Sequence, residues 1–261
     1  MPRESLMQNI SLSRSERDQE EIRRSAVEAA RITVSPISVD RYLDPPSDAL
    51  YALEFAYHLL GDVRGKTVLD LGCGSGENLI ALVDRGANVV GIDVSPDLIR
   101  LSQQRLDLAG KVASLRATTA YDTGLPDESV DVVFAISVLH HLELPVAREE
   151  IRRILRKDGR FILKEPIRFS RTLNRMRTLF PARDEVSSYE HPLNQAELAM
   201  VTEGFTVIAQ RSFRLPFVPL LGAHRPHHNK RIWEADRWLN QHFPKLEHYA
   251  TSKVMSLRRS Y

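Results

Sequence analysis

The chain has 261 residues, of which 43% are hydrophobic and 27% are charged, with a formal net charge of +2 and a single cysteine. These values favour one globular domain with appendages, and they exclude an intramolecular disulfide and the strong basic excess of a typical nucleic-acid surface. No apolar run approaches the ~20 residues of a membrane span, and the first ten residues lack the apolar stretch of a secretory signal. We therefore expect a cytoplasmic protein without a membrane span.

The N-terminal part predicts a polar tail followed by two helices. Residues 15–32 are rich in Glu, Arg and Ala, with apolar positions near one face, which is typical of an amphipathic helix. Three prolines follow. Apolar residues then recur at helical spacing over 48–60, with Ser47 as the expected cap.

Short apolar runs alternate with helical patterns through the rest of the chain, which is typical of a parallel sheet. The predicted strands cover residues 67–71, 88–92, 113–117, 130–136, 160–164, 205–211 and 249–257. The predicted helices between them cover residues 77–85, 96–108, 145–156, 194–203 and 230–243. Ser95 and Pro96 form a favourable helix start, because the hydroxyl caps and proline lacks only an N–H that would be unpaired.

The run VLDLGCGSG at residues 68–76 predicts a buried strand that ends in a glycine turn. Glycine adopts positive φ and lets the backbone approach a ligand, while the following helix directs unpaired N–H groups to the same place. A dinucleotide-binding turn has a third glycine where this chain has Glu77. A carboxylate there repels a pyrophosphate, so the turn indicates a positively charged cofactor with sulfonium and ammonium groups.

LDLGCGSG at residues 69–76 and VVGIDVSPDLI at residues 89–99 resemble the first two motifs of the class I S-adenosylmethionine-dependent methyltransferases. The resemblance covers about residues 67–167. It implies a Rossmann-like α/β fold, in which helices cover both faces of a seven-stranded, mostly parallel sheet with an antiparallel last strand. Apart from the resemblance, we expect the N-terminal helices, at about residues 15–60, to form a lid over the cofactor, because isolated helices of marginal hydrophobicity order best when docked on something.

We expect the chain to divide into two parts. Residues 1–47 form the tail and helical cap, and residues 48–261 form the methyltransferase domain. Within that domain, residues 67–167 are the cofactor-binding core and residues 168–248 are substrate-side insertions.

The resemblance also implies S-adenosylmethionine as cofactor. Asp70 is expected near its methionine end, and Asp93 is expected to accept hydrogen bonds from the ribose hydroxyls, at the roughly 20-residue interval usual for such a carboxylate. Tyr121 either stacks on the adenine or is an ordinary half-buried aromatic residue. The expected cofactor-binding residues are Asp70, Gly72, Cys73, Gly74, Gly76, Asp93, Val94, Thr119, Ala120, Tyr121 and Ile136.

The end of the fourth predicted strand limits the chemistry. Its sequence, Ile136-Ser137-Val138-Leu139, lacks the Pro-Pro-aromatic turn of methyltransferases that act on nucleobase amines or glutamine amides. It also lacks the aspartate that holds Mg²⁺ in the catechol type, and Ser137 is a poor substitute. We therefore expect no metal.

Three residues are candidates for catalysis. In the resembling family, a pair such as His140 and His141 usually shapes the boundary between cofactor and substrate, although histidine is also a common general base. Glu165 follows the fifth strand at the ligand-binding rim of the sheet. It either orients or deprotonates a substrate hydroxyl, or it is a solvated strand end.

The segment after Pro166 is expected on the substrate side. Its basic residues predict a solvated helix or a site for an acidic substrate, and they are Arg168, Arg171, Arg175, Arg177 and Arg183. The apolar run 215–221 lines a hydrophobic pocket or packs in the core. The tract AHRPHHNK at residues 223–230 is interpreted as a polar turn, because no standard set of four zinc ligands includes its histidines.

Together these features predict metal-independent methyl transfer from S-adenosylmethionine to a small-molecule acceptor. An RNA or protein acceptor is the first alternative, and a catalytically inactive cofactor-binding partner protein is the second. The sequence leaves the methylated atom and the oligomeric state open.

Overall fold

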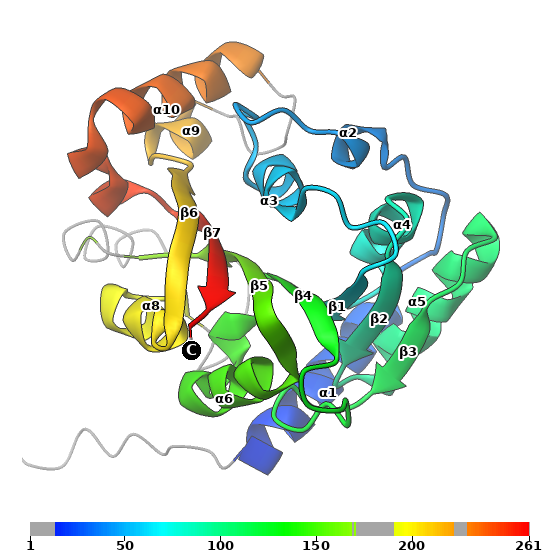
Figure 1. Ribbon diagram of the computed structural model, residues 1–261. Helices are drawn as coiled ribbons and strands as arrows, with labels where there is room; N and C mark the ends of the chain where they lie inside the picture. Colours follow the sequence, from blue (N-terminus) through cyan, green and yellow to red (C-terminus); the bar gives the residue numbers. More distant parts are fainter. Residues whose placement is uncertain (1–13, 169, 171–190, 222–228, 261) are drawn as a thin grey trace, which may run out of the picture.

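A seven-stranded sheet organises the structure (Figure 1). The computed structural model describes residues 14–168, 170, 191–221 and 229–260, and its strand order is β3-β2-β1-β4-β5-β7-β6. The strands are β1 Thr67–Leu71, β2 Asn88–Asp93, β3 Ser114–Ala117, β4 Val130–Ile136, β5 Leu155–Pro166, β6 Phe205–Phe213 and β7 Ser252–Arg259. Strands β1 to β5 pair in parallel, and β7 lies antiparallel between β5 and β6. The predicted Rossmann-like sheet is confirmed.

Helices cover both faces of this sheet. The helices are α1 Arg14–Ala29, α2 Asp40–Leu43, α3 Ala52–Leu60, α4 Glu77–Asp84, α5 Pro96–Ala109, α6 Leu144–Ile154, α8 Gln195–Thr202, α9 Phe217–Leu220 and α10 Lys230–His242, with short 3₁₀ turns η1 Leu139–His141 and η2 Pro244–Tyr249. Helices α3, α4 and α5 pack on one face, and α6 and α8 pack on the other. None of the helices in the described ranges is both long and apolar enough to cross a membrane.

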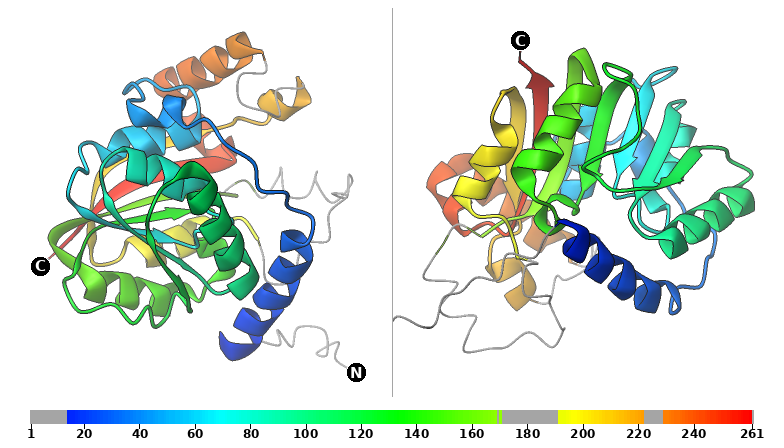
Figure 2. Two further views of the ribbon diagram at one scale, coloured as in Figure 1. Left: turned by 90° about the vertical axis from the view of Figure 1, so that its right-hand side faces the viewer. Right: turned by 90° about the horizontal axis from the view of Figure 1, so that it is seen from below.

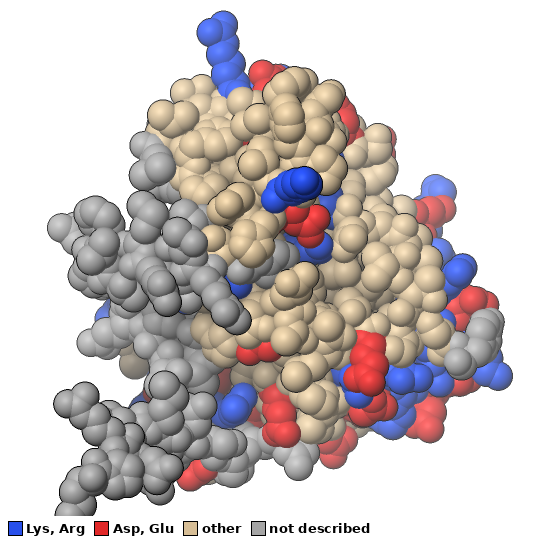
Figure 3. Space-filling view, turned by 90° about the vertical axis from the view of Figure 1, so that its left-hand side faces the viewer, with Lys and Arg blue, Asp and Glu red and all other residues tan. Residues whose placement is uncertain are grey.

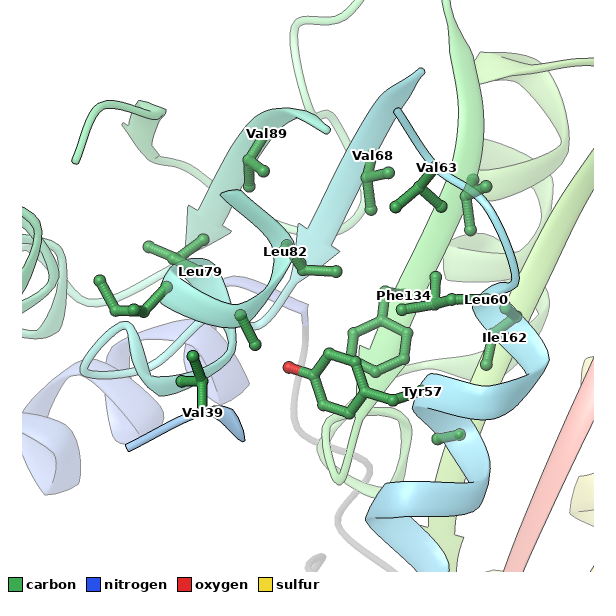
Figure 4. Packing of buried hydrophobic residues seen from close by; sticks show 14 of the residues in the cluster. Val39, Tyr57, Leu60, Val63, Val68, Leu79, Leu82, Val89, Phe134 and Ile162 are labelled. Carbon is green, nitrogen blue, oxygen red and sulfur yellow. The ribbon is translucent and has the colours of Figure 1, made fainter. Parts of the chain in front are cut away.

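The core on the α3 face is centred on Tyr57, which has no exposed surface (Figure 4). Its ring lies 5.0 Å from that of Phe134 in β4 and 4.7 Å from that of Tyr42 in α2. Its hydroxyl donates to the Asn78 side-chain oxygen at 3.0 Å, so the buried O–H keeps a partner. These contacts join α2, α3 and α4 to the sheet.

The two N-terminal helices occupy different places. Helix α3 packs on the sheet, whereas α1 lies beside α5 and away from the sheet (Figure 2). The buried contact between α1 and α5 consists of Ala29, Leu98 and Leu101. Helix α3 is therefore part of the layer that covers the sheet, and the cap over the cofactor stays a prediction for α1.

The predicted start of α3 is wrong. The helix begins at Ala52 rather than at residue 48, and Ser47 does not cap it. Tyr51 is extended at the N-cap position, with its ring 5.1 Å from that of Trp233 in α10. This tertiary contact holds the chain out of the helix.

The predicted boundary between α6 and β5 is also wrong. The helix ends at Ile154, and β5 starts at Leu155 instead of residue 160. The register against β4 shifts between Val130 and Val132, which places a β-bulge in β5. Asp158 has a φ of +63° within this bulge.

Part of the segment expected on the substrate side lies within the described residues. Leu215 and Val218 pack into two small buried clusters, which favours the core interpretation of the apolar run 215–221. The arginines at 171, 175, 177 and 183 and the histidines at 224, 227 and 228 lie outside the described residues.

Candidate functional site

A cavity of about 200 Å³ lies at the carboxyl ends of the parallel strands. Ligands bind at this edge of open α/β sheets. The glycine turn, the ends of β2 and β4, and helix α1 all contribute to it. The lining residues are Arg17, Asp18, Glu21, Glu28, Leu71, Gly72, Gly74, Ser75, Ile92, Asp93, Val94, Leu98, Thr118, Ala120, Ser137, Val138, His141 and Leu142.

Two glycines of the turn after β1 differ in what surrounds them. Gly72 has a φ of +71°, and a Cβ atom there would lie 2.4 Å from Val138 Cγ2. Gly74 has a φ of +54°, but a Cβ atom there would meet no atom within 4 Å. The space beside Gly74 is therefore free for a ligand, whereas Gly72 is required by the close approach of the loop after β4.

Asp93 connects the ends of β1 and β2. Its Oδ2 accepts the Gly74 N–H at 2.9 Å, and its Oδ1 accepts the Ser95 N–H at 2.9 Å. Burial raises the pKa of this carboxyl, and the two N–H donors oppose the shift. Asp93 thus fixes the glycine turn and also faces the cavity.

Asp70 is fully buried next to the two lining residues Leu71 and Gly72. Neither of its oxygens has a hydrogen-bond partner among the described residues. Burial raises the pKa of Asp70 to about 8, the Asp93 charge adds to the shift, and the nearby Asn78 side chain opposes it. A buried carboxyl group without a partner is unusual, because desolvation without a compensating bond is costly.

The loop after β4 is organised by Glu165, whose side chain has no exposed surface. Its Oε1 accepts the backbone N–H groups of Val138 and Leu139, each at 2.9 Å. Its Oε2 lies 2.8 Å from His140 Nδ1. The alternative that Glu165 is a solvated strand end is therefore wrong. Glu165 fixes the backbone of the loop that lines the cavity.

Helix α1 meets this loop at an ion pair. Glu21 Oε2 lies 3.3 Å from His141 Nδ1, and the His141 side chain lowers the pKa of Glu21. His141 lines the cavity, whereas His140 and Glu165 do not.

The cavity wall carries more negative than positive side chains. Four carboxylates line it, Asp18, Glu21, Glu28 and Asp93, against one arginine, Arg17, and one histidine. This negative charge suits a cationic ligand. The presence of Glu77 where a dinucleotide-binding turn has its third glycine indicates the same.

Comparisons with known proteins agree with this geometry. The family described as a methyltransferase domain matches residues 69–163, which include the glycine turn, Asp93 and the loop after β4. The chain carries a class I S-adenosylmethionine-dependent methyltransferase domain.

The methyltransferase domain has relatives with different acceptors. A ubiquinone biosynthesis O-methyltransferase of Azorhizobium caulinodans is 33% identical over 116 residues, which are 44% of this chain and 44% of that protein. A tRNA U34 carboxymethyltransferase of Aeromonas hydrophila is 33% identical over 108 residues, 40% of this chain and 33% of that protein. The chain thus covers less than half of each of these two relatives.

Among solved structures, the methyltransferase domain resembles geranyl diphosphate C-methyltransferase from Streptomyces coelicolor, solved with Mg²⁺, geranyl diphosphate and S-adenosylhomocysteine. The TM-score is 0.59 at 15% identity, over 95% of this chain and 100% of that one. At this identity, the likeness establishes the fold.

The residues expected to bind the cofactor fall into two groups. Those that line the cavity are Gly72, Gly74, Asp93, Val94 and Ala120. Those that do not line it are Asp70, Cys73, Gly76, Thr119, Tyr121 and Ile136.

Most residues of the second group lie behind the lining residues, where they pack or form hydrogen bonds. Burial raises the pKa of the Cys73 thiol well above its usual range, which agrees with packing rather than nucleophilic chemistry. The Tyr121 hydroxyl accepts the Glu143 N–H at 2.9 Å. Gly76 is required by close packing, because a Cβ atom there would lie 2.8 Å from Ser102 Oγ.

Sequence reasoning missed the four residues of α1 that line the methyltransferase cavity. Arg17, Asp18, Glu21 and Glu28 have helical spacings of three, four and seven and form one polar stripe. A polar stripe of this kind is also typical of a solvated helix face. Only the packing of Ala29 against Leu98 and Leu101 of α5, a contact between distant segments, brings this stripe to the cavity.

Proposed function

We propose that the protein binds S-adenosylmethionine in this cavity and transfers its methyl group to a small-molecule acceptor, without a metal ion. The observation that carries the proposal is the buried Asp70 carboxyl, which lacks a hydrogen-bond partner in the described protein. An unsatisfied buried group costs about 1–3 kcal/mol. Asp70 does not line the cavity but directly precedes the lining residues Leu71 and Gly72. A cationic N–H group of the cofactor that reaches past them would remove this cost, and Asp70 is our candidate for holding the methionine end of the cofactor.

Asp93 and the loop after β3 suit the nucleoside part of the cofactor. Each Asp93 oxygen accepts one backbone N–H, so each retains a lone pair for a ribose hydroxyl. Thr118 and Ala120 line the cavity nearby and are our candidates for adenine contacts. Thr119, Tyr121 and Ile136 then act as supports of this layer.

The bound cofactor supplies an already activated methyl group, so the protein contributes mainly orientation. Within the loop after β4, His141 faces the cavity, and Glu165 and His140 hold the backbone that carries it. We assign Glu165 a positioning role, because its carboxylate is buried and used by the loop.

A small acceptor is favoured by the small volume of the cavity, about 200 Å³, and by its position between α1 and the loop after β4. In this division of the chain, residues 1–47 are the cap, and residues 48–261 are the catalytic domain, with the acceptor side at 168–248. An RNA acceptor is disfavoured by the small net charge. On the face in Figure 3, the described Lys and Arg side chains form no broad basic patch and lie among Asp and Glu.

The test has two steps. Titration calorimetry with S-adenosylmethionine measures binding first, and absence of binding refutes the proposal. The protein is then incubated with methyl-labelled S-adenosylmethionine and the small-molecule, RNA or protein fraction of a cell extract. We expect label in the small-molecule fraction. Label in RNA or protein would support the first alternative, and binding without transfer to any fraction would support the inactive partner protein.

A further inference from the structure

Ser137 and Lys164 form a hydrogen-bonded pair where β4 and β5 end. The Lys164 ammonium donates to Ser137 Oγ at 2.8 Å, and the Ser137 N–H donates to the Lys164 carbonyl at 2.7 Å. Ser137 has a φ of +57°, which is uncommon for a residue other than glycine. Backbone strain of this kind is concentrated at functional sites.

The donor inventory leaves the Ser137 hydroxyl proton available. An ammonium group only donates, so Ser137 Oγ accepts in this bond and its own proton is directed elsewhere. The described residues offer this hydroxyl no acceptor, and Ser137 lines the cavity. The cavity therefore has one O–H donor that is backed by a positive charge.

The positive charge of Lys164 is not neutralised by a neighbouring carboxylate. Within the described ranges, no carboxylate lies in ion-pair distance of its ammonium, and the adjacent Glu165 uses its oxygens on Val138, Leu139 and His140. Burial lowers the pKa of Lys164, Glu165 opposes this shift and the positive charge of Arg214 adds to it. The carboxylates of α1 and Asp93 suit the cationic part of the cofactor. The half-buried Lys164, with the positive charge of Arg214 nearby, instead favours an anionic oxygen at Ser137.

We propose that Ser137 and Lys164 form an oxyanion-binding dyad for the methyl acceptor. The Ser137 hydroxyl donates to a negatively charged acceptor oxygen, and Lys164 positions and polarises that hydroxyl. The acceptor class is a small molecule with an acidic hydroxyl group, such as a phenol, which releases its proton to water and binds as the anion. This inference rests on the proposed function and deepens it. The dyad also gives the acceptor oxygen a polar partner, a role that Glu165 does not fill because its oxygens bond to Val138, Leu139 and His140.

The test uses 4-nitrophenol, whose phenolate form has its own visible absorbance. The full chain is saturated with S-adenosylhomocysteine, and the probe is titrated with acid and base in its presence. We expect the pKa of the bound probe to fall by about one to two units, the size of one charge-assisted hydrogen bond. Lys164→Met and Ser137→Ala should abolish the shift, and Lys164→Arg should restore a large part of it. Lys157→Met is the matched control, because this exposed lysine is near the other end of β5.

The outcomes separate the dyad from the proposed function. Loss of the shift in Lys164→Met with an unchanged affinity for S-adenosylhomocysteine supports the dyad. An unperturbed probe in the wild-type protein at millimolar concentration overturns it, as does an equal shift in Lys164→Met. If S-adenosylhomocysteine does not bind, the proposed function fails, and the probe titration without it still decides whether the dyad binds an oxyanion.

Discussion

Asp70 should couple cofactor binding to proton release. Its pKa of about 8 means that about nine tenths of the carboxyl groups are protonated at pH 7 in the free protein. A cationic ligand favours the ionised form, so binding should expel up to about 0.9 proton per site near pH 7. Asp70→Asn keeps the shape of the side chain and removes this titration.

The same carboxyl group should also make the free energy of unfolding depend on pH. Folding favours its protonated form, whereas binding of a cationic ligand favours its ionised form. The pKa of Asp70 rises from 3.8 to about 8 on folding, so its contribution is complete below pH 4 and is lost as the pH rises towards 8. About four units at about 1.4 kcal/mol each give a loss of about 6 kcal/mol in the free protein. Unfolding in urea at several pH values should show that loss in the wild type and a much flatter profile in Asp70→Asn.

The proton count is measured by titration calorimetry with S-adenosylmethionine in two buffers of different ionisation enthalpy. We expect a buffer-dependent enthalpy for the wild type, little dependence for Asp70→Asn, and the wild-type value for Asp107→Asn, an exposed control. The substitution at Asp70 should also weaken binding by about 1.5–3 kcal/mol. Equal enthalpies in both buffers for the wild type would refute the reasoning.

Three further predictions concern other parts of the site. Asp93→Ala should weaken S-adenosylmethionine binding by about 1.5–3 kcal/mol, and an unchanged affinity by calorimetry would remove the ribose assignment. Glu165→Gln should lower the free energy of unfolding by about 3 kcal/mol, because one side-chain oxygen must replace two acceptors in a buried loop. Glu149→Gln, at an exposed position, should stay within about 0.5 kcal/mol in the same urea titration. Methyl transfer should survive treatment with EDTA, whereas strict dependence on added Mg²⁺ would contradict the metal-free prediction.

The sequence predicted the parts of the fold that depend on local patterns. The bounds of β1 and β4 agree with the prediction because their apolar runs are short and end at a glycine turn or at polar residues. Ser95 caps α5 as predicted, because this cap depends only on residues of the same helix: the Ser95 hydroxyl accepts the Leu98 N–H.

The rest depended on contacts between distant segments. The start of α3 follows from the packing of Tyr51 on Trp233, and the early start of β5 follows from its register with β4. The pairing of Ser137 with Lys164 likewise requires that Ile136 and Lys164 face each other across neighbouring strands. No local pattern encodes such a register.

The position of β7 has a consequence for the order in which the sheet is completed. Among the strands in the described part of the chain, β6 pairs only with β7, which follows it by about forty residues. During synthesis, β6 and α8 therefore leave the ribosome before β6 has any neighbour, and β6 exposes two open edges until residues 252–259 emerge. Strands β1 to β4, where we propose that the cofactor binds, need no such delay. They can pair before residues 252–259 are synthesised, whereas the proposed acceptor side cannot complete its part of the sheet until then.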